Sequence, residues 1–492
     1  MNLLTDDFIS TTVGKVSLKE LLTSEMDYQL QYAFDEIQLA MLQLLASLST
    51  VVLKPSLEEL KGYLKQGLTA EQYELKLEKV DCQWFDESYF MRSTFPENEK
   101  TADAPITKMI SGIECGTSPN ALGLFSEIQQ ADTICPDCTH VLNYNLHMNI
   151  KGECFGPTGA TGIRGGGALS TLIAGNNLKH TILANTVAVD YFEELVDLKE
   201  PDNQFMWQSS PQGEIYYAHH IGLERGLFAL AYHIHFTTID KPCLCDVCGH
   251  QSSQSIKEFT RLKYKGSYGS TKKGRDGGAQ WWPHPFTPTT TKEEGTFAVC
   301  ARDQNWQSWQ NFSSYVIGKE TDKSLSSPTF IIDQYRKLKI GGGNLLIGGN
   351  IADQGSITGR IYDLYSMPEH WDSEKLERVE KVIDAGIQVK DKLTKALNKM
   401  FGAGYDKNYI SGIKSTTINQ YISNAQNIIQ QLLIDVDRVE ARELRKQALV
   451  QLKAEAKTIY QSLMRQYQND LSLFKALAKG ERILMAVNKI KT

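Results

Sequence analysis

Four cysteines in two Cys-x-x-Cys pairs have the residue type and spacing of metal ligands. They are Cys135 and Cys138 and, much later in the chain, Cys245 and Cys248. Each pair can offer two thiolates to one ion from a tight turn, and four thiolates complete the closed tetrahedral shell of a structural zinc site. One ligand could instead be His140, His250 or Cys243, and unrelated buried thiols are a further alternative. A closed shell leaves no position for a substrate, so the spacing favours a structural ion over a hydrolytic one.

A glycine-rich segment follows the first pair and a basic stretch follows the second. Residues 156–167 are rich in glycine, which has no Cβ, so their backbone can approach a phosphate or a groove edge closely. They fit neither a phosphate-binding loop nor a dinucleotide fingerprint, so a surface loop without a ligand is the alternative. Residues 257–275 contain many lysines and arginines, one acid, and two interleaved tyrosines. Such a stretch suits contacts to phosphates, and a solvated charged face is the alternative.

A polar turn flanked by glycines lies at residues 348–356. Its pattern predicts a hairpin with Asp353, Gln354 and Gly355 at the tip. Gln354 could then project one long amide side chain outward. An ordinary hairpin tip without a ligand is the alternative.

Length and charge limit the classes of function. A chain of 492 residues exceeds what one hydrophobic core usually organises, and a hydrophobic content of 41% is enough for two cores. The net charge of −6 argues against a protein that coats nucleic acid over its whole surface, so any contact with a polyanion must be local. The first residues lack the features of a signal peptide, and no run of about eighteen apolar residues occurs. We therefore expect a cytoplasmic protein without a membrane partner.

Two regions of different composition predict two domains and the α+β class. Residues 1–366 mix helical patterns, as around 41–45, with glycine-rich loops and strand-like runs such as 329–332 and 345–347. This pattern indicates a large irregular mixed α/β N-terminal domain that contains the zinc site. Residues 367–492 contain few glycines and prolines, and their amphipathic segments predict a C-terminal four-helix bundle. The predicted helical segments are roughly 373–400, 414–434, 437–467 and 469–490.

Several motifs occur in an order that resembles one known family. They are MNLLTDDFI at the start, the paired cysteines, GIRGGG at 162–167, GLERGLF at 222–228, WWPHPFTP at 281–288, the 353–355 tip and the terminal helical region. Together they resemble, from end to end of the chain, the large subunit of the type I-E CRISPR surveillance complex, Cascade (the CasA family). The resemblance implies a subunit that finds the short protospacer-adjacent motif of double-stranded DNA, while base pairing to the guide RNA reads the remaining sequence.

The resemblance implies a wedge and a lysine that contact the DNA. The wedge is a glutamine that enters the duplex below the motif and starts strand separation, and it falls on Gln354, with Asp353 and Gly355 beside it. Unstacking one base step costs about a few kcal/mol, which inserted side chains can offset. The lysine falls on Lys265. The segment before residue 282 is longer than in some relatives, so other lysines are alternatives. They are Lys263, Lys272 and Lys273.

The resemblance also implies a glycine loop and a contact to the guide RNA. The glycine loop, which approaches the motif from the minor groove, falls on residues 154–159 and includes Gly156 and Gly159. Pro157 stands where some relatives have glycine, which predicts a different motif preference. The aromatic contact to the 5′ handle of the guide RNA falls on Phe125, a residue type that is otherwise typical of a core.

The resemblance implies no catalytic residue and several partners. The partners are the guide RNA, double-stranded target DNA, the backbone and small subunits of the complex, and a separate nuclease-helicase that is recruited after R-loop formation. Two other functions stay open. One is a zinc-dependent hydrolase or nuclease, motivated by the cysteines together with His140, His250 and His284. The other is a purely architectural scaffold whose loops never touch DNA.

Overall fold

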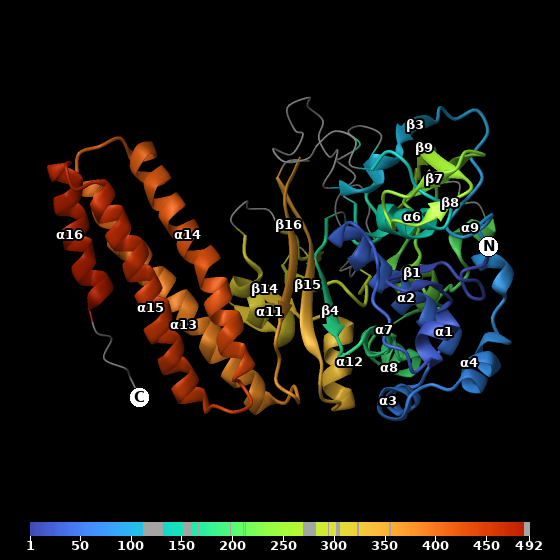
Figure 1. Cartoon of the computed structure of the whole chain (residues 1–492), viewed down its shortest axis with the longest axis horizontal. Helices are drawn as coiled ribbons and strands as arrows, with labels where there is room; N and C mark the ends of the chain where they lie inside the picture. The colour runs from blue at the N-terminus through green and yellow to red at the C-terminus, as the bar shows by residue number, and fades with distance from the viewer. Residues whose placement is uncertain are drawn as a thin grey trace. The chain divides into compact units, whose positions relative to one another are not determined.

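The structure of the chain, a computed structural model, comprises two compact units (Figure 1). One unit contains Met1–Trp306 and Ser314–Leu364, and the other contains Gln307–Ser313 and Tyr365–Thr492. The structure describes residues 1–111, 131–150, 155, 159–165, 167–196, 198–209, 211, 213–268, 282–293, 295–301, 306–321, 324–353 and 356–486. The larger unit mixes helices and short sheets, which confirms the mixed α/β class predicted for this region.

A helix that is buried on all sides organises the larger unit. Helix α2 (Asp35–Leu53) is rich in apolar residues and buried along nearly its whole length, so other elements must cover every face. Helices α4 (Ala70–Leu77), α6 (Cys138–Met148) and α7 (Leu178–Asn185) pack against it. By length and composition α2 alone among the described helices could span a membrane, but 94% of its apolar window is buried inside the protein. It is therefore a core helix, and the helical pattern predicted around residues 41–45 is confirmed.

A three-stranded sheet lies on this helix. Its strands, in the order β16 (Ser356–Tyr365), β15 (Asn344–Asp353) and β4 (Ser170–Ala174), run side by side in Figure 1. Strands β15 and β4 are antiparallel, with Gly348 opposite Ser170. A Cβ at Gly348 would lie only 2.6 Å from Cδ2 of Leu39 on α2, so this close approach of strand and helix requires glycine.

The strand predicted at residues 329–332 is wrong, because these residues begin helix α12 (Phe330–Leu338). The Thr329 side chain accepts a hydrogen bond from the Ile332 amide and caps the helix. The apolar run then continues as the buried face of a helix that contacts β4. The neighbouring prediction is confirmed, since residues 345–347 lie within β15.

A second three-stranded sheet carries part of the basic stretch. Strand β9 (Ser255–Lys263) lies between β3 (Ala102–Pro105) and β6 (Tyr232–Ile239), antiparallel to both. Lys257 and Lys263, near the two ends of β9, are exposed, whereas Arg261 between them is buried.

Shorter elements complete the larger unit. The remaining strands are β1 (Ile9–Thr11), β2 (Gly14–Val16), β5 (Ile215–Tyr216), β7 (Cys243–Leu244), β8 (Gln251–Ser252), β10 (Ser267–Tyr268), β11 (Thr289–Lys292), β12 (Gly295–Ala298), β13 (Lys319–Thr321) and β14 (Ser324–Ser327). The remaining helices before residue 365 are α1 (Leu18–Thr23), η1 (Cys82–Phe85), η2 (Ile106–Met109), α3 (Leu57–Gln66), α8 (Val189–Leu195), α9 (Met206–Ser209), η4 (Ala218–His220), α10 (Leu223–Leu227), η6 (Ser308–Asn311) and α11 (Phe312–Val316).

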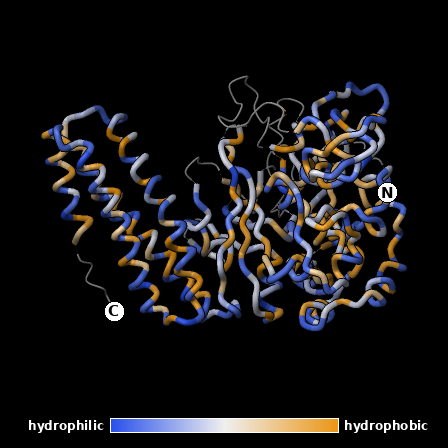
Figure 2. The backbone as a smooth tube through the Cα atoms, in the orientation of Figure 1, coloured by the Kyte–Doolittle hydropathy of each residue, from blue (hydrophilic) through white to orange (hydrophobic). Residues whose placement is uncertain are grey.

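Each helical segment predicted after residue 367 contains a helix. The helices are α13 (Ser373–Leu397), which continues as η7 (Asn398–Gly402), α14 (Lys407–Ile434), α15 (Ala441–Gln466) and α16 (Leu471–Met485). Figure 2 shows that apolar and hydrophilic residues recur along each of them. Helix α13 packs against the other three. Helix α14 begins earlier than the predicted residue 414, because the Asp406 side chain accepts hydrogen bonds from the Asn408 and Tyr409 amides.

A tryptophan from residues 307–313 is built into this helical unit, which the sequence did not indicate. Trp309 is fully buried, and its indole N–H donates to the Ile422 carbonyl over 3.1 Å. A Cβ at Gly386 on α13 would lie 2.8 Å from Cζ3 of Trp309. Gly386 therefore provides the space that the indole ring fills.

Alanine at Gly386 should destabilise the helical unit, whereas alanine at Gly412 should stabilise it. Both glycines lie inside helices, where alanine is favoured by about 1 kcal/mol. At Gly386 the new methyl group collides with the indole ring, and such overpacking costs about 1–3 kcal/mol. At Gly412 a Cβ would have no heavy atom of the described residues within 4 Å. Urea unfolding of G386A and G412A tests the difference in sign, and an equal gain in both would contradict the packing.

Candidate metal centre and nucleic-acid interface

Two tight turns present the four cysteines. Cys135 precedes α6, and the Cys138 amide at the start of that helix donates to the Cys135 carbonyl over 3.2 Å. The second turn follows β7, where the Gly249 amide donates to the Cys245 carbonyl over 2.8 Å. Gly249 has a φ of +75°, a conformation that favours glycine. Reciprocal backbone hydrogen bonds between residues 134 and 256 tie the first turn to β9.

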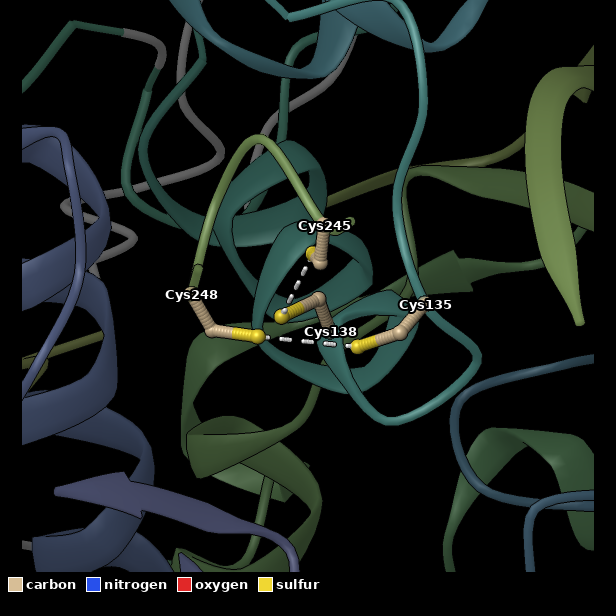
Figure 3. Close-up of side chains that lie close together, drawn as sticks. All are labelled: Cys135, Cys138, Cys245 and Cys248. Atoms are coloured by element: carbon tan, nitrogen blue, oxygen red, sulfur yellow. Dashed lines mark hydrogen bonds between the residues drawn. The ribbon is translucent and has the colours of Figure 1, made fainter. Parts of the chain in front are cut away.

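The four sulfur atoms converge on one point (Figure 3). All four cysteines are buried, and their Sγ atoms lie within 4.8 Å of one another. The Cys135–Cys248 and Cys138–Cys245 Sγ–Sγ distances are both 3.7 Å. A tetrahedral ion with metal–sulfur bonds of about 2.3 Å requires sulfur atoms about 3.8 Å apart, whereas a disulfide bond is about 2.05 Å long. The cluster therefore has the geometry of a four-sulfur metal site.

The electrostatics of the cluster favour thiolates at two of the four cysteines, while hydrogen bonds within the cluster and burial raise the pKa of Cys135 and Cys138. Hydrogen bonding from Cys135, and then from Cys138, lowers the pKa of both Cys245 and Cys248. Lys15 forms an ion pair with Asp137 beside the cluster. Burial alone would lower the pKa of Lys15, but its bond to Asp137 and the nearby cysteine sulfurs raise it. A charged lysine here would offset the excess negative charge of four thiolates on a divalent ion.

The proposed substitute ligands lie elsewhere. His140 packs edge-on against Phe8 and Phe90, and burial lowers its pKa to about 3. The Cys243 thiol contacts the Gln254 carbonyl over 3.4 Å. Among the residues that the structure describes, the metal-competent group consists of the four cysteines and no histidine. This donor set is typical of a structural ion.

The glycine-rich segment packs on the basic sheet. The Arg261 guanidinium of β9 lies 4.2 Å from the centre of the Phe155 ring, and the Ala160 amide donates to the Tyr232 hydroxyl of β6 over 2.7 Å. A Cβ at Gly162 would lie 2.4 Å from the His147 carbonyl oxygen, so the segment can sit this close only with glycine. Gly159 is half-buried between these anchors, and Gly156 lies outside the described residues.

The structure also locates part of the predicted basic site. Lys265 follows β9, its side chain is 59% exposed, and it pairs with Glu99. An exposed ion pair contributes little stability, so a phosphate can replace Glu99 at low cost. Lys263 is exposed as well. Lys272, Lys273 and the predicted guide-RNA residue Phe125 lie outside the described residues.

The β15–β16 pair carries the predicted tip. Asp353 ends β15 and Ser356 begins β16, while Gln354 and Gly355 between them lie outside the described residues. Below the tip, the Ala352 amide donates to the Ala301 carbonyl over 3.0 Å. The strands that lead to the tip are thus anchored in the larger unit.

Comparison with known proteins decides the family. The family model for CRISPR-associated protein Cse1 matches residues 2–459. The chain belongs to the Cse1 family. This match confirms the resemblance found from the motifs.

Solved Cse1 structures have the same fold. The Thermus thermophilus CasA (Cse1) structure has a TM-score of 0.69 and 14% identity, and the match covers 98% of both chains. Thermobifida fusca Cse1 gives the same values. A chain of a structure described as a CRISPR RNA-guided surveillance complex has a TM-score of 0.62 and 11% identity, and the match covers 99% of both chains. At these identities the likeness establishes the fold of this Cse1 family member.

Several residues that organise this Cse1 fold were not identified from the sequence. Arg164 lies in the GIRGGG motif but received no role, and Glu36 and Arg360 belong to no motif. The sequence contains one signal for Glu36. Residues 35–36 are acidic and directly precede an apolar-rich segment, so the buried helix that forms there has a carboxylate in its first turn. Their partners are distant in the chain and could not be found from spacing.

Replacing one cluster cysteine should release the metal, and replacing its neighbour should not. C245S removes one of the four ligands, so the metal content should fall from about one ion per chain to near zero and the unfolding temperature should drop. C243S is the matched control, because the Cys243 thiol contacts backbone carbonyls and lies outside the cluster. Elemental analysis and thermal unfolding of both variants provide the measurement. Full metal content in C245S would contradict the assignment.

Proposed function

We propose that this Cse1 family member is the non-catalytic large subunit of an RNA-guided surveillance complex. In that role it recognises the protospacer-adjacent motif in double-stranded DNA and starts strand separation for R-loop formation. Family membership and the likeness to a chain of a CRISPR RNA-guided surveillance complex support the role. Base pairing to a guide RNA then reads the target, and the protein needs to read only a short motif.

The observation that carries the proposal is the packing of the glycine segment on the sheet that leads to Lys265. The Phe155–Arg261 contact joins the glycine segment to a strand with exposed lysines. A duplex that contacts this surface can approach the backbone closely at Gly156 and Gly159. Its phosphates then meet a cation at Lys265. With a net charge of −6, this local basic surface restricts DNA contact to one region.

The wedge role belongs to the tip of the β15–β16 pair. Gln354 enters the duplex below the motif, and Asp353 and Gly355 shape the turn that presents it. Inserting one side chain offsets the unstacking of a base step, about a few kcal/mol. The strands on either side of the tip are anchored in the larger unit, so they hold the tip in place when it presses on the base pairs.

The remaining parts serve assembly. The four cysteines hold zinc, which as a closed four-sulfur site supplies a rigid link between two turns and no reaction. The C-terminal helices form a four-helix bundle that contacts the small subunits, and Phe125 contacts the 5′ handle of the guide RNA. The subunit acts in the cytoplasm and helps to recruit a separate nuclease-helicase. Hydrolysis at the metal is the weaker candidate, because all ligands in the described cluster are thiols and none is a histidine.

Q354A should slow strand opening without weakening the first contact with the motif. We expect R-loop formation by the assembled complex to slow by at least about tenfold. This change corresponds to an activation free energy that is about 1.4 kcal/mol higher. A target with mismatched base pairs directly below the motif is already open and should restore the rate. Stopped-flow R-loop kinetics and motif-dependent duplex binding measure the two steps. Equal loss in both steps would contradict the wedge.

K265A should reduce both DNA affinity and its salt dependence. Losing one phosphate contact lowers the slope of log K against log salt by about one, and at about 0.15 M salt this weakens binding roughly fivefold. K65A, at the exposed end of α3, is the control and should leave the slope unchanged. Titrations of the assembled complex with a motif-containing duplex provide the measurement. An unchanged slope for K265A would move the contact to another lysine.

A further inference from the structure

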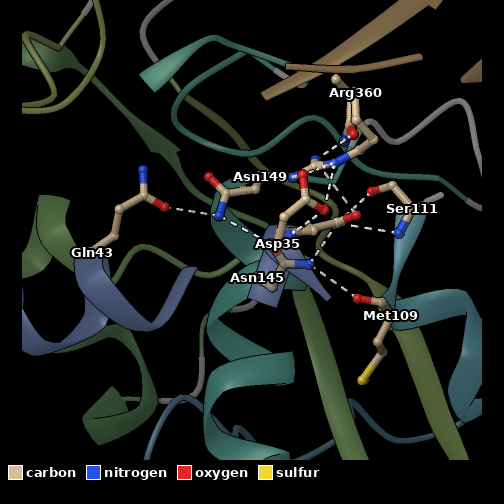
Figure 4. A network of polar contacts seen from close by, with 9 residues as sticks. Asp35, Gln43, Met109, Ser111, Asn145, Asn149 and Arg360 are labelled. Atoms are coloured by element: carbon tan, nitrogen blue, oxygen red, sulfur yellow. Dashed lines mark hydrogen bonds and ion pairs between the residues drawn. The ribbon is translucent and has the colours of Figure 1, made fainter. Parts of the chain in front are cut away.

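A buried polar network connects the glycine segment to the β15–β16 pair. Figure 4 shows its central part, which joins Arg360 of β16 to the start of α2 and to the end of α6. The successive members are Arg164, Asn149, Asn145, Glu36, Arg360 and Asn350. The network thus begins in the GIRGGG motif and ends on the strand that leads to the proposed wedge.

Glu36 is the centre of this network. Its side chain is 3% exposed, and its Oε1 atom accepts hydrogen bonds from the Ser111 amide over 3.1 Å, the Ser111 hydroxyl over 2.7 Å and the Asn145 amide group over 2.8 Å. Its Oε2 atom has no hydrogen-bond partner among the described residues and faces Nη1 of Arg360 at 3.7 Å. A buried carboxylate requires such compensation, so the position of Arg360 is tied to that of Glu36.

Arg360 uses its planar guanidinium to join three elements. Nη1 donates to the Asn350 side chain on β15 over 2.6 Å, and Nη2 lies 3.2 Å from the Asp35 carboxylate on α2. Arg360 itself belongs to β16. Only a forked donor can serve these acceptors at once, so lysine is not an equivalent residue here.

Arg164 supplies the other end. It is buried, and burial lowers its pKa to about 10, so it stays charged at neutral pH. Its hydrogen-bond acceptors are neutral oxygens of Thr287, Asn149, Leu169 and Ser170. A buried charge with only neutral acceptors is costly in stability. Gln43 of α2 bonds to both Ser170 and Asn149 and closes the network around Arg164.

The network leaves little room for rearrangement. A cavity of about 10 Å³ lies among Glu36, Asn149, Ser170, Asn350 and Arg360. Such a volume is at the lower limit for a single water molecule. The strands above this point can therefore move relative to α2 only if the polar contacts break.

We propose that Arg360 and Glu36 are positioning residues that hold the β15–β16 pair in one orientation relative to the glycine segment. The inference rests on the proposed wedge function. In it, motif contact at the glycine segment and insertion of the tip occur in one rigid frame, because both ends belong to the same network. If these polar contacts are lost, the glycine segment still contacts the motif. The tip, however, moves back when it presses on the base pairs.

The test uses Arg360→Lys in the assembled complex, with Arg378→Lys as control. Arg378 is a second arginine with forked contacts, to Glu374 and Glu440 in the helical unit, and it is buried, so it reports general destabilisation. For R360K we expect faster hydrogen exchange in β15 and β16 without DNA, unchanged binding to a motif-containing duplex, and R-loop formation slowed about tenfold. A target that is already open below the motif should restore the rate. R378K should change none of these.

The double variant separates positioning from a general structural role. If Arg360 acts through the tip, R360K combined with Q354A should open DNA no more slowly than Q354A alone. Additive slowing, or motif binding that weakens as much as opening, would overturn the proposal. Unchanged hydrogen exchange in β15 and β16 of R360K would also overturn the proposal, even if Q354A slows R-loop formation. If exchange rises in R360K while Q354A opens DNA normally, the positioning holds and the wedge function fails.

Discussion

The carboxylate of Glu36 is the constraint on which the larger unit depends. It lies in the first turn of a helix that is covered on every side, so water cannot solvate it and the protein must supply every partner. The positive end of the helix dipole favours a carboxylate there but cannot satisfy it alone. For that reason the carboxylate is contacted by Ser111, Asn145 and Arg360. One buried charge thereby brings Ser111, helix α6 and strand β16 to a common point.

The four-cysteine cluster acts in a similar way on another part of the unit. Its two turns are far apart in the chain, and each is short and polar, with little apolar surface of its own to bury. Four sulfur atoms at metal-binding distances can hold one ion, and a bound ion would link the two turns through a few strong bonds. Because residues 134 and 256 are paired through their backbones, the rigidity of the cluster extends to β9 and so to the basic surface.

This arrangement suits the proposed role in DNA recognition. A surface that reads a few base pairs needs loops that keep their place while they are loaded, and a chain with a net charge of −6 needs its cations gathered in one place. Packing of Phe155 and Tyr232 against Arg261 holds the glycine segment beside the basic strand. The buried contacts below the β15–β16 tip serve the same need at the other end of the network.

Local interactions explain what the sequence by itself determined. Cys-x-x-Cys spacing sets which thiols can share an ion, and helical periodicity sets where α13 to α16 form, so both were predictable, although the start of α14 depended on its Asp406 cap. The motif order sufficed for the Cse1 family, and β15 followed from its apolar run. The apolar run at 329–332 misled because a strand and a helix start share it, and only the Thr329 cap distinguishes them.

Tertiary structure alone decided the partners of buried charges and rings. Arg360 and Asp35 are 325 positions apart, and Trp309 meets a helix carbonyl 113 positions away. No periodicity links such residues, because they come together only when whole elements pack and each buried polar group must find an acceptor or donor within reach. Local sequence therefore specified the elements and the metal ligands, and desolvation on packing specified the network that positions them.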